Sequence, residues 1–120
     1  MKTIAVVEDN ADNRLLLNAF LGDRYRITEY ETGPSALDGF KAHIPDLILL
    51  DVSLPGMDGL AVLTHIRADD KLKKLPVIAL TAHAMHGDRE RFLKAGFNDY
   101  VSKPIVDEQV LLTAISKLIP

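Results

Sequence analysis

Acidic residues follow two short apolar runs that lie far apart in the sequence. Glu8 and Asp9 come directly after the run 4–7, and Asp51 follows the run 47–50. Short apolar runs that stop at a polar residue are typical of parallel strands covered on both faces. In open α/β sheets, chemistry gathers at the carboxyl ends of such strands. If the two strands are neighbours, three carboxylates converge on one crevice and can bind a divalent cation.

Two further strand-like runs, the first of them apolar, end in residues of different chemistry. Thr81 follows the run 77–80, and Lys103 follows the run 99–102. As neighbours of the first two strands, these runs would add a hydroxyl donor and a compact positive charge to the carboxylates. Such a set can handle a phosphoryl group as well as a cation.

The composition limits the classes of function. The 120 residues suffice for one domain over 1–120, and 48% of them are apolar, which argues against disorder. A net charge of −3 lacks the basic footprint of nucleic-acid binding. The absence of cysteine excludes disulfides, thiolate metal sites and cysteine nucleophiles. No apolar stretch approaches the roughly 18 residues that span a bilayer, and no signal-peptide pattern precedes the first strand, so we expect a cytoplasmic protein.

Strand and helix patterns alternate along the whole chain. Strands are predicted at 4–7, 25–30, 47–50, 77–80 and 99–102, the second of them at a sheet edge because it is more polar. The first four helices are expected to start with Asp12 as a cap, with Pro34 at a first position, with Asp58 as a cap, and at about residue 85, and a fifth helix follows the last strand. Their predicted core residues are Leu16, Leu17, Phe20, Leu21, Ala36, Leu37, Phe40, Leu60, Leu63, Ile66, Phe92, Leu93, Val110, Leu111, Ala114, Ile115 and Leu118.

The alternation predicts an α/β fold in which a strand–helix unit occurs five times. Right-handed crossovers then give a doubly wound, three-layer sandwich with a five-stranded parallel sheet. The strand order 2-1-3-4-5 would place the ends of strands 1 and 3 at the topological switch point. Periodicity alone does not choose this order over others.

Five motifs in this order resemble the receiver domain of two-component response regulators, over the whole chain. They are Glu8-Asp9, Asp51, the segment Leu54-Pro55-Gly56-Met57-Asp58-Gly59, Thr81-Ala82 and Lys103-Pro104. The resemblance implies the flavodoxin-like strand order 2-1-3-4-5. The segment 81–88 is most similar to stand-alone receivers and to receivers attached to hybrid kinases. Nothing follows the last helix, so we expect no output domain in this chain.

The resemblance implies a role in phosphorelay signal transduction. Asp51 would accept a phosphoryl group from a histidine kinase or a histidine phosphotransfer protein, as carboxylates can do. Thr81 and Lys103 would contact the transferred phosphoryl oxygens. The domain would assist its own phosphorylation and dephosphorylation without being an enzyme in its own right. The implied Mg2+ site consists of Glu8, Asp9, Asp51 and the backbone carbonyl of Ser53.

A conformational switch is also implied by the resemblance. Thr81 would move toward the phosphoryl oxygens, and Tyr100 would fill the space that it leaves. The face made by the fourth helix, the fifth strand and the fifth helix would then change for an unidentified downstream protein. We expect a monomer or a weak dimer.

Smaller expectations follow from the same resemblance. The Lys103-Pro104 peptide bond would be cis. Asn13, Arg14 and Leu17 on the first helix would face a kinase helix. Ser53 and His83, each two residues after a site residue, would influence the lifetime of the phosphoryl group.

Several alternatives compete with this interpretation. A flavin-binding electron carrier would need a donor-rich phosphate loop after the first strand, where Glu8 and Asp9 would repel phosphate. A Mg-dependent phosphatase would carry a second aspartate two residues after its nucleophile, a spacing that the segment 8–11 lacks. A degenerate receiver used only for docking is disfavoured by the complete set of site residues. His83 and His86 are interpreted as helix-start residues rather than zinc ligands, and Asp58 as a helix cap rather than a metal ligand.

Overall fold

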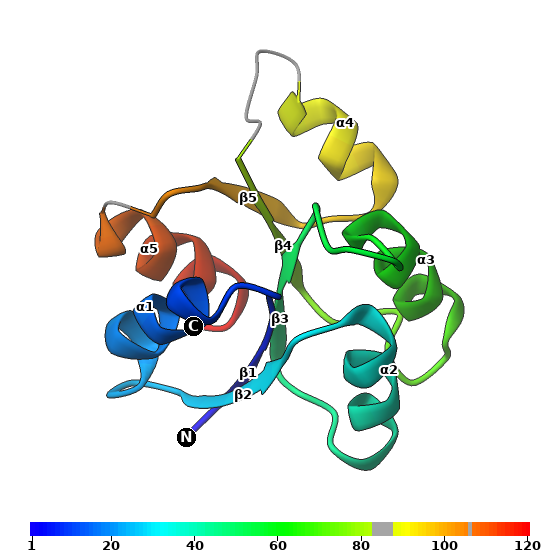
Figure 1. Cartoon of the computed structure of the whole chain (residues 1–120), viewed down its shortest axis with the longest axis horizontal. Coiled ribbons are helices and arrows are strands. Elements are labelled where there is room, and N and C mark those ends of the chain that lie inside the picture. The colour runs from blue at the N-terminus through cyan, green and yellow to red at the C-terminus, as the bar shows by residue number, and fades with distance from the viewer. Residues whose placement is uncertain (83–87, 106) are drawn as a thin grey trace.

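The computed structural model describes residues 1–82, 88–105 and 107–120, which form a parallel five-stranded sheet covered by helices (Figure 1). The strand order is β2-β1-β3-β4-β5, which confirms the predicted order 2-1-3-4-5. The strands are β1 (Thr3–Val7), β2 (Arg26–Tyr30), β3 (Leu47–Asp51), β4 (Val77–Thr81) and β5 (Asp99–Ser102). The helices are α1 (Ala11–Leu21), α2 (Gly33–Ala42), α3 (Gly59–Ala68), α4 (Asp88–Ala95) and α5 (Glu108–Leu118).

Helices cover both faces of the sheet, because alternate side chains of each strand point in opposite directions. In β1, Ile4 and Val6 pack toward α1 and α5, whereas Ala5 and Val7 pack toward α2 and α3. Figure 1 shows the two helix layers on either side of the sheet, with α4 beside β5. Burial on both faces explains why the sequences of β1, β3 and β4 are almost entirely apolar.

The helix starts agree only partly with the predicted caps. Asn10, not Asp12, caps α1, and its side chain accepts a hydrogen bond from the backbone N–H of Asn13 at 3.0 Å. Either residue type can cap a helix, so the sequence did not distinguish them. Asp58 caps α3 as predicted. Pro34 is the second residue of α2, not the first, because that helix begins at Gly33 after the N-cap Thr32.

Three residues predicted to face the core are exposed instead: Leu60, Leu93 and Val110, with 43%, 41% and 54% of their surface accessible. Each lies one residue from a buried position, which turns its side chain about 100° around the helix. In α3, for example, the buried stripe runs through Val62, Leu63 and Ile66 and leaves Leu60 outside it. At these three positions the predicted core face of the helix was therefore wrong by one residue.

The predicted helix at about 85–95 corresponds to α4, whose described part begins at Asp88. Residues 85–87 lie outside the described residues. The helix ends before Gly96 as predicted, and the φ of +117° at Gly96 is a conformation that glycine adopts without strain. In the described part of the chain, no helix has the length and apolar character required to cross a membrane.

Candidate functional site

The ends of β1 and β3 bring the three predicted acidic residues together. The two strands pair in parallel with Val7 opposite Leu50, so the next step along each strand places Glu8 beside Asp51. Oxygen atoms from the carboxylates of Glu8, Asp9 and Asp51 all lie within 4.8 Å of one another. Glu8 and Asp51 are buried, whereas Asp9 is exposed. The predicted convergence of the three carboxylates is confirmed.

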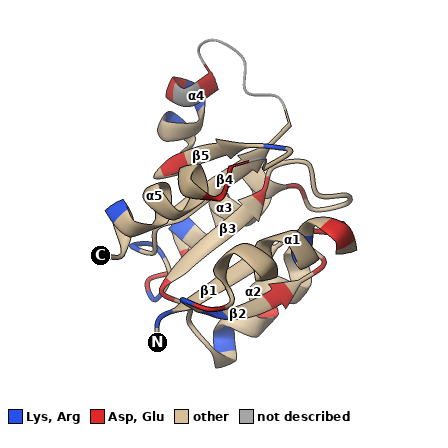
Figure 2. Cartoon of the chain, turned by 90° about the vertical axis from the view of Figure 1, so that its left-hand side faces the viewer, with Lys and Arg blue, Asp and Glu red and all other residues tan. Residues whose placement is uncertain are grey.

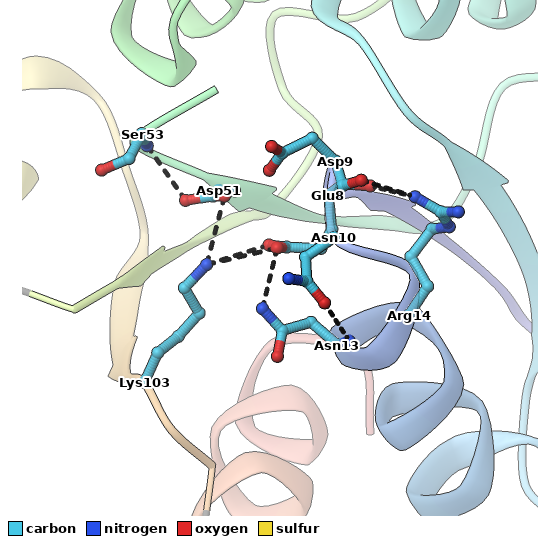
Figure 3. Close-up of polar contacts among 8 residues, drawn as sticks. All are labelled: Glu8, Asp9, Asn10, Asn13, Arg14, Asp51, Ser53 and Lys103. Carbon is cyan, nitrogen blue, oxygen red and sulfur yellow. Dashed lines mark hydrogen bonds and ion pairs between the residues drawn. The ribbon is translucent and has the colours of Figure 1, made fainter. Parts of the chain in front are cut away.

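Lys103 reaches the same cluster from the end of β5. Its backbone N–H donates to the carbonyl of Thr81 at 2.8 Å, which ties the segment after β5 to the end of β4. Its Nζ lies 3.1 Å from Oε2 of Glu8 and 3.1 Å from Oδ2 of Asp51 (Figure 3). One ammonium group therefore bridges the two buried carboxylates. The Lys103-Pro104 peptide bond is cis, as the resemblance implied.

The orientation of Asp51 is fixed by the segment that follows it. Oδ1 of Asp51 accepts a hydrogen bond from the backbone N–H of Ser53 at 2.9 Å. Gly59, at the start of α3, donates its N–H to the carbonyl of Val52 at 3.1 Å. A Cβ atom on residue 59 would collide with the backbone carbonyl of Asp51. Only glycine allows α3 to begin this close to Asp51, which explains the second glycine of the segment 54–59.

Glu8 is the most enclosed charge of the site. Its Oε1 accepts a hydrogen bond from Nδ2 of Asn13 at 2.9 Å, and both of its carboxylate oxygens contact Lys103. Burial raises the pKa of Glu8 above its ordinary value of 4.5, the hydrogen bond from Asn13 opposes this, and the charge of Asp51 adds to it. Burial acts to lower the pKa of Lys103, but its contacts with Glu8 and Asp51 outweigh burial and raise it.

Arg14 holds the backbone of the loop that carries the acidic pair. Its Nη1 donates to the carbonyls of Glu8 at 2.9 Å and Asp9 at 3.2 Å. Its guanidinium also pairs with Glu29 at 3.4 Å and Glu31 at 3.2 Å, at the end of β2 and just beyond it. The acidic loop is thereby fastened to the edge strand. Figure 2 shows the acidic residues at the carboxyl ends of the strands and at the start of α1.

These contacts bear on the expected role of the first helix. Asn13 and Arg14 were predicted to face a kinase helix; both are partly exposed and also contact Glu8, and their role toward a kinase stays a prediction. The prediction for Leu17 is wrong, because only 1% of its surface is exposed and it packs in the core. Sequence reasoning missed the two contacts. The available signal was their position in the first turn of a helix directly after the acidic pair.

The predicted switch residues lie on neighbouring strands. Thr81 is buried at the end of β4, opposite Ser102 of β5. Tyr100 is half-buried on β5, and its ring packs against Phe92 of α4 with ring centres 5.9 Å apart. The roles of both residues in switching stay predictions. His83 and His86, including the expected effect of His83 on phosphoryl lifetime, lie outside the described residues.

The chemistry of the site fits a hard divalent cation. The three acidic residues offer only oxygen ligands, which Mg2+ prefers, and their mutual repulsion is only partly offset by one ammonium group. Asp58 lies outside this set, because its side chain accepts from the N–H of Ala61 as the cap of α3. The arrangement can hold a cation beside a carboxylate nucleophile, with a lysine placed to meet an incoming anion.

Comparisons with known proteins point to one family. Residues 4–116 match the model of the response regulator receiver domain. A polar-differentiation response regulator, DivK, from Brucella anthropi is 43% identical over 105 residues, covering 87% of this chain and 85% of that protein.

Solved structures give the same result. The receiver domain of sensor histidine kinase PA1611 from Pseudomonas aeruginosa, solved with magnesium in its active site cleft, matches with a TM-score of 0.88 and 38% identity over 98% of this chain and 97% of that one. The receiver domain of a histidine kinase from Syntrophus aciditrophicus matches with a TM-score of 0.88 and 30% identity over 99% of this chain and 90% of that one.

Proposed function

This chain belongs to the response regulator receiver domain family, which acts in phosphorelay signal transduction, and we propose that Asp51 is its phosphoryl acceptor. The observation that carries the proposal is the position of Asp51, buried at the end of β3 with Lys103 Nζ 3.1 Å from Oδ2. The donor would be a phosphohistidine of a histidine kinase or a histidine phosphotransfer protein. Membership of this family sets aside the flavin-carrier and phosphatase alternatives.

We assign the metal of this site to Mg2+, held by Glu8, Asp9 and Asp51 with the backbone carbonyl of Ser53. The oxygen-only donor set and the Mg2+ in the receiver of PA1611 support the assignment. When bound, Mg2+ neutralises negative charge on the transferring phosphoryl oxygens. Asp9, which is exposed, gives the site an open side toward solvent.

The transfer exchanges one bond to phosphorus for another. An Asp51 carboxylate oxygen forms a bond to phosphorus while the bond from phosphorus to the donor histidine nitrogen breaks, leaving its electron pair on that nitrogen. The product is an acyl phosphate on Asp51 and a histidine that recovers its proton from solvent. The backbone N–H of Ser53 holds the carboxylate in place at 2.9 Å. Lys103 and the Thr81 hydroxyl would hold the phosphoryl oxygens, and attack by water on the same phosphorus would reverse the modification.

The signal would leave the site through β4 and β5. Thr81 ends β4, and Tyr100 of the neighbouring strand β5 contacts Phe92 of α4. Movement of Thr81 toward a phosphoryl group would open space for Tyr100, and a shift of Tyr100 would change the packing of α4. This chain of contacts supports a switch of the α4-β5-α5 face, to which a downstream protein would bind.

Acetyl phosphate with Mg2+ tests the acceptor assignment directly, with intact mass and peptide mapping as the readout. The parent protein is expected to gain one phosphoryl group on Asp51, and Asp51→Asn is expected to gain none. Asp58→Asn is the matched control, because it removes a nearby aspartate that caps α3 without touching the site, and it should be labelled like the parent. Undiminished labelling of Asp51→Asn at another residue would refute the assignment.

A second variant, phosphorylated in the same way but followed by NMR, tests the switch. Thr81→Ala is expected to be phosphorylated on Asp51 but to show smaller phosphorylation-dependent changes in the amide NMR spectrum of α4 and β5. If those changes equal the parent's, Thr81 does not couple the site to that face.

A further inference from the structure

We propose that Asn13 is a positioning residue for the magnesium site, holding the carboxylate of Glu8 in the orientation that serves the cation. The inference rests on the function proposed above and extends it to a residue outside the predicted set of ligands. Figure 3 shows the Asn13 amide directed at the Glu8 carboxylate, on the side away from Asp9.

The position of Asn13 is fixed by a contact that does not involve Glu8. Its backbone N–H donates to the side chain of the cap Asn10 at 3.0 Å, which places it in the first turn of α1. From there its Nδ2 reaches Oε1 of Glu8 at 2.9 Å. An ionised carboxylate has no proton to give, so the amide must be the donor. One short side chain thus connects the start of α1 to the acidic cluster.

The Glu8 carboxylate requires a second partner to stay in one orientation. It carries one more methylene than aspartate, so its carboxylate has more rotational freedom and costs more entropy to hold still. Lys103 contacts both of its oxygens but also contacts Asp51, and would be drawn toward a phosphoryl group in the transfer. Asn13 is uncharged, so a phosphoryl group would not attract it away from Glu8 and a cation would not repel it. It can therefore keep Glu8 in place when Lys103 turns to another anion.

Outer partners of this kind matter for metal binding in general. Groups that hydrogen-bond to a ligating side chain orient it, and their removal typically weakens metal affinity by about 10–100-fold. Because Asn13 donates to only one of the two oxygens of Glu8, we expect a loss at the lower end of this range.

Calorimetric titration of the metal-free protein with MgCl2 provides the test. Asn13→Leu preserves size but removes the donor, and is expected to raise the Kd for Mg2+ about tenfold. Asn18→Leu is the matched control on the same helix, because the Asn18 amide donates to the backbone carbonyl of Arg14 at 3.3 Å rather than to the acidic cluster. Its Kd should equal that of the parent.

A double-mutant cycle with Glu8→Gln separates positioning from general loosening of the helix. If Asn13 acts through Glu8, adding Asn13→Leu to Glu8→Gln should change the Kd by less than about twofold. An equal loss in both backgrounds would overturn the inference, as would an unchanged Kd in Asn13→Leu alone, and both results would leave the proposed function standing. A parent protein that takes up no Mg2+ would overturn the proposed function and this inference together.

A spectroscopic measurement keeps the inference testable even if Asn13→Leu folds poorly. The side-chain NH2 signals of Asn13 and Asn18 can be assigned in the folded parent and followed by 1H–15N NMR. The Asn13 signal is expected to move on saturation with Mg2+ and to differ between the parent and Glu8→Gln, whereas the Asn18 signal stays in place. An Asn13 signal that shifts neither on Mg2+ saturation nor in Glu8→Gln would contradict the positioning role.

Discussion

Among single residues, Glu8 experiences the strongest opposing influences. It is 1% exposed and lies beside Asp51, and both conditions disfavour its charge. Asn13 and Lys103 donate to it and favour the charged form. Burial is the largest of these influences, so the pKa of Glu8 in the folded protein is raised above the ordinary 4.5.

The raised pKa of Glu8 predicts a pH-dependent change in stability. The folded state holds this proton more tightly than the unfolded state, so the stabilisation from Glu8 is complete below pH 4.5 and is lost as the pH rises through the folded pKa. In metal-free buffer, the free energy of unfolding of the parent minus that of Glu8→Gln is therefore expected to fall as the pH rises above 4.5. Urea unfolding of both proteins at a series of pH values measures this difference.

A surface carboxylate provides the comparison for this measurement. Glu108 is exposed in the first turn of α5, where water solvates it in both the folded and the unfolded state. Glu108→Gln makes the same chemical change outside the acidic site and serves as the matched control. A difference for Glu8→Gln that rises with pH would mean that the donors around Glu8 outweigh its burial.

At the scale of elements, Arg67 joins α3 to the segment before β4 and to the segment between α4 and β5. Its Nε and Nη2 donate to the carbonyl of Gly96 at 3.0 and 2.7 Å, and Nη2 also donates to Oδ1 of Asn98 at 2.9 Å. Its Nη1 donates to the carbonyls of Leu75 at 2.7 Å and Lys73 at 2.9 Å. One guanidinium thus fastens the end of α4 and the approaches to β4 and β5 to α3.

Replacing this guanidinium should weaken the attachment of α4. Arg67→Lys keeps the charge but cannot reproduce a planar fork of donors, so several carbonyls lose their partners. We expect a loss of about 2–4 kcal/mol in the free energy of unfolding, measured by urea denaturation. Hydrogen exchange should also become faster at the backbone N–H of Gly96, which bonds to the last turn of α4.

The matched control is Arg24→Lys, which changes an exposed arginine in the loop between α1 and β2. Its effect is expected to stay within about 0.5 kcal/mol. If Arg67→Lys is equally mild, the hydrogen bonds from Arg67 to Gly96 and Asn98 are not the main attachment of α4, and the packing of Phe92 must supply it.

At the scale of the whole molecule, two apolar core clusters, one on each face of the sheet, support a concentration of like charge at one edge of the sheet. The unfolded chain separates Glu8 and Asp9 from Asp51, whereas folding brings them within 4.8 Å. A cation that binds this arrangement binds only the folded state and stabilises it by mass action. The fold and the proposed metal site are therefore thermodynamically linked.

This linkage predicts that Mg2+ raises the stability of the domain. At a free concentration of 100 times the Kd, the gain in the free energy of unfolding should be about 2.7 kcal/mol. Asp9→Asn is expected to lose most of this gain at the same Mg2+ concentration. Calorimetric or urea unfolding, with and without Mg2+, measures it.

A neighbouring acidic residue controls for nonspecific effects of the salt. Asp12 is exposed in the first turn of α1, and its replacement by Asn should leave the gain from Mg2+ unchanged. Equal stabilisation of the parent and Asp9→Asn would show that Mg2+ acts at another place on the protein.

The sequence by itself determined the alternation of elements and the positions of the site residues along the chain. The buried runs before Glu8, Asp51 and Thr81 are visible because a strand covered on both faces must be apolar throughout. Placing these residues at strand ends then required only that parallel strands finish at the same edge. The glycine at position 96 likewise marked the end of α4.

Only the tertiary structure decided which partners the site residues have. Asn10 rather than Asp12 caps α1, Leu17 faces the core, and Asn13 and Arg14 turn to the acidic loop. The pairing of Lys103 with Glu8 joins residues 95 positions apart. Local patterns reflect neighbours within one helical turn or one strand, whereas these contacts depend on strand order, register and helix phase, which are fixed when the whole chain packs.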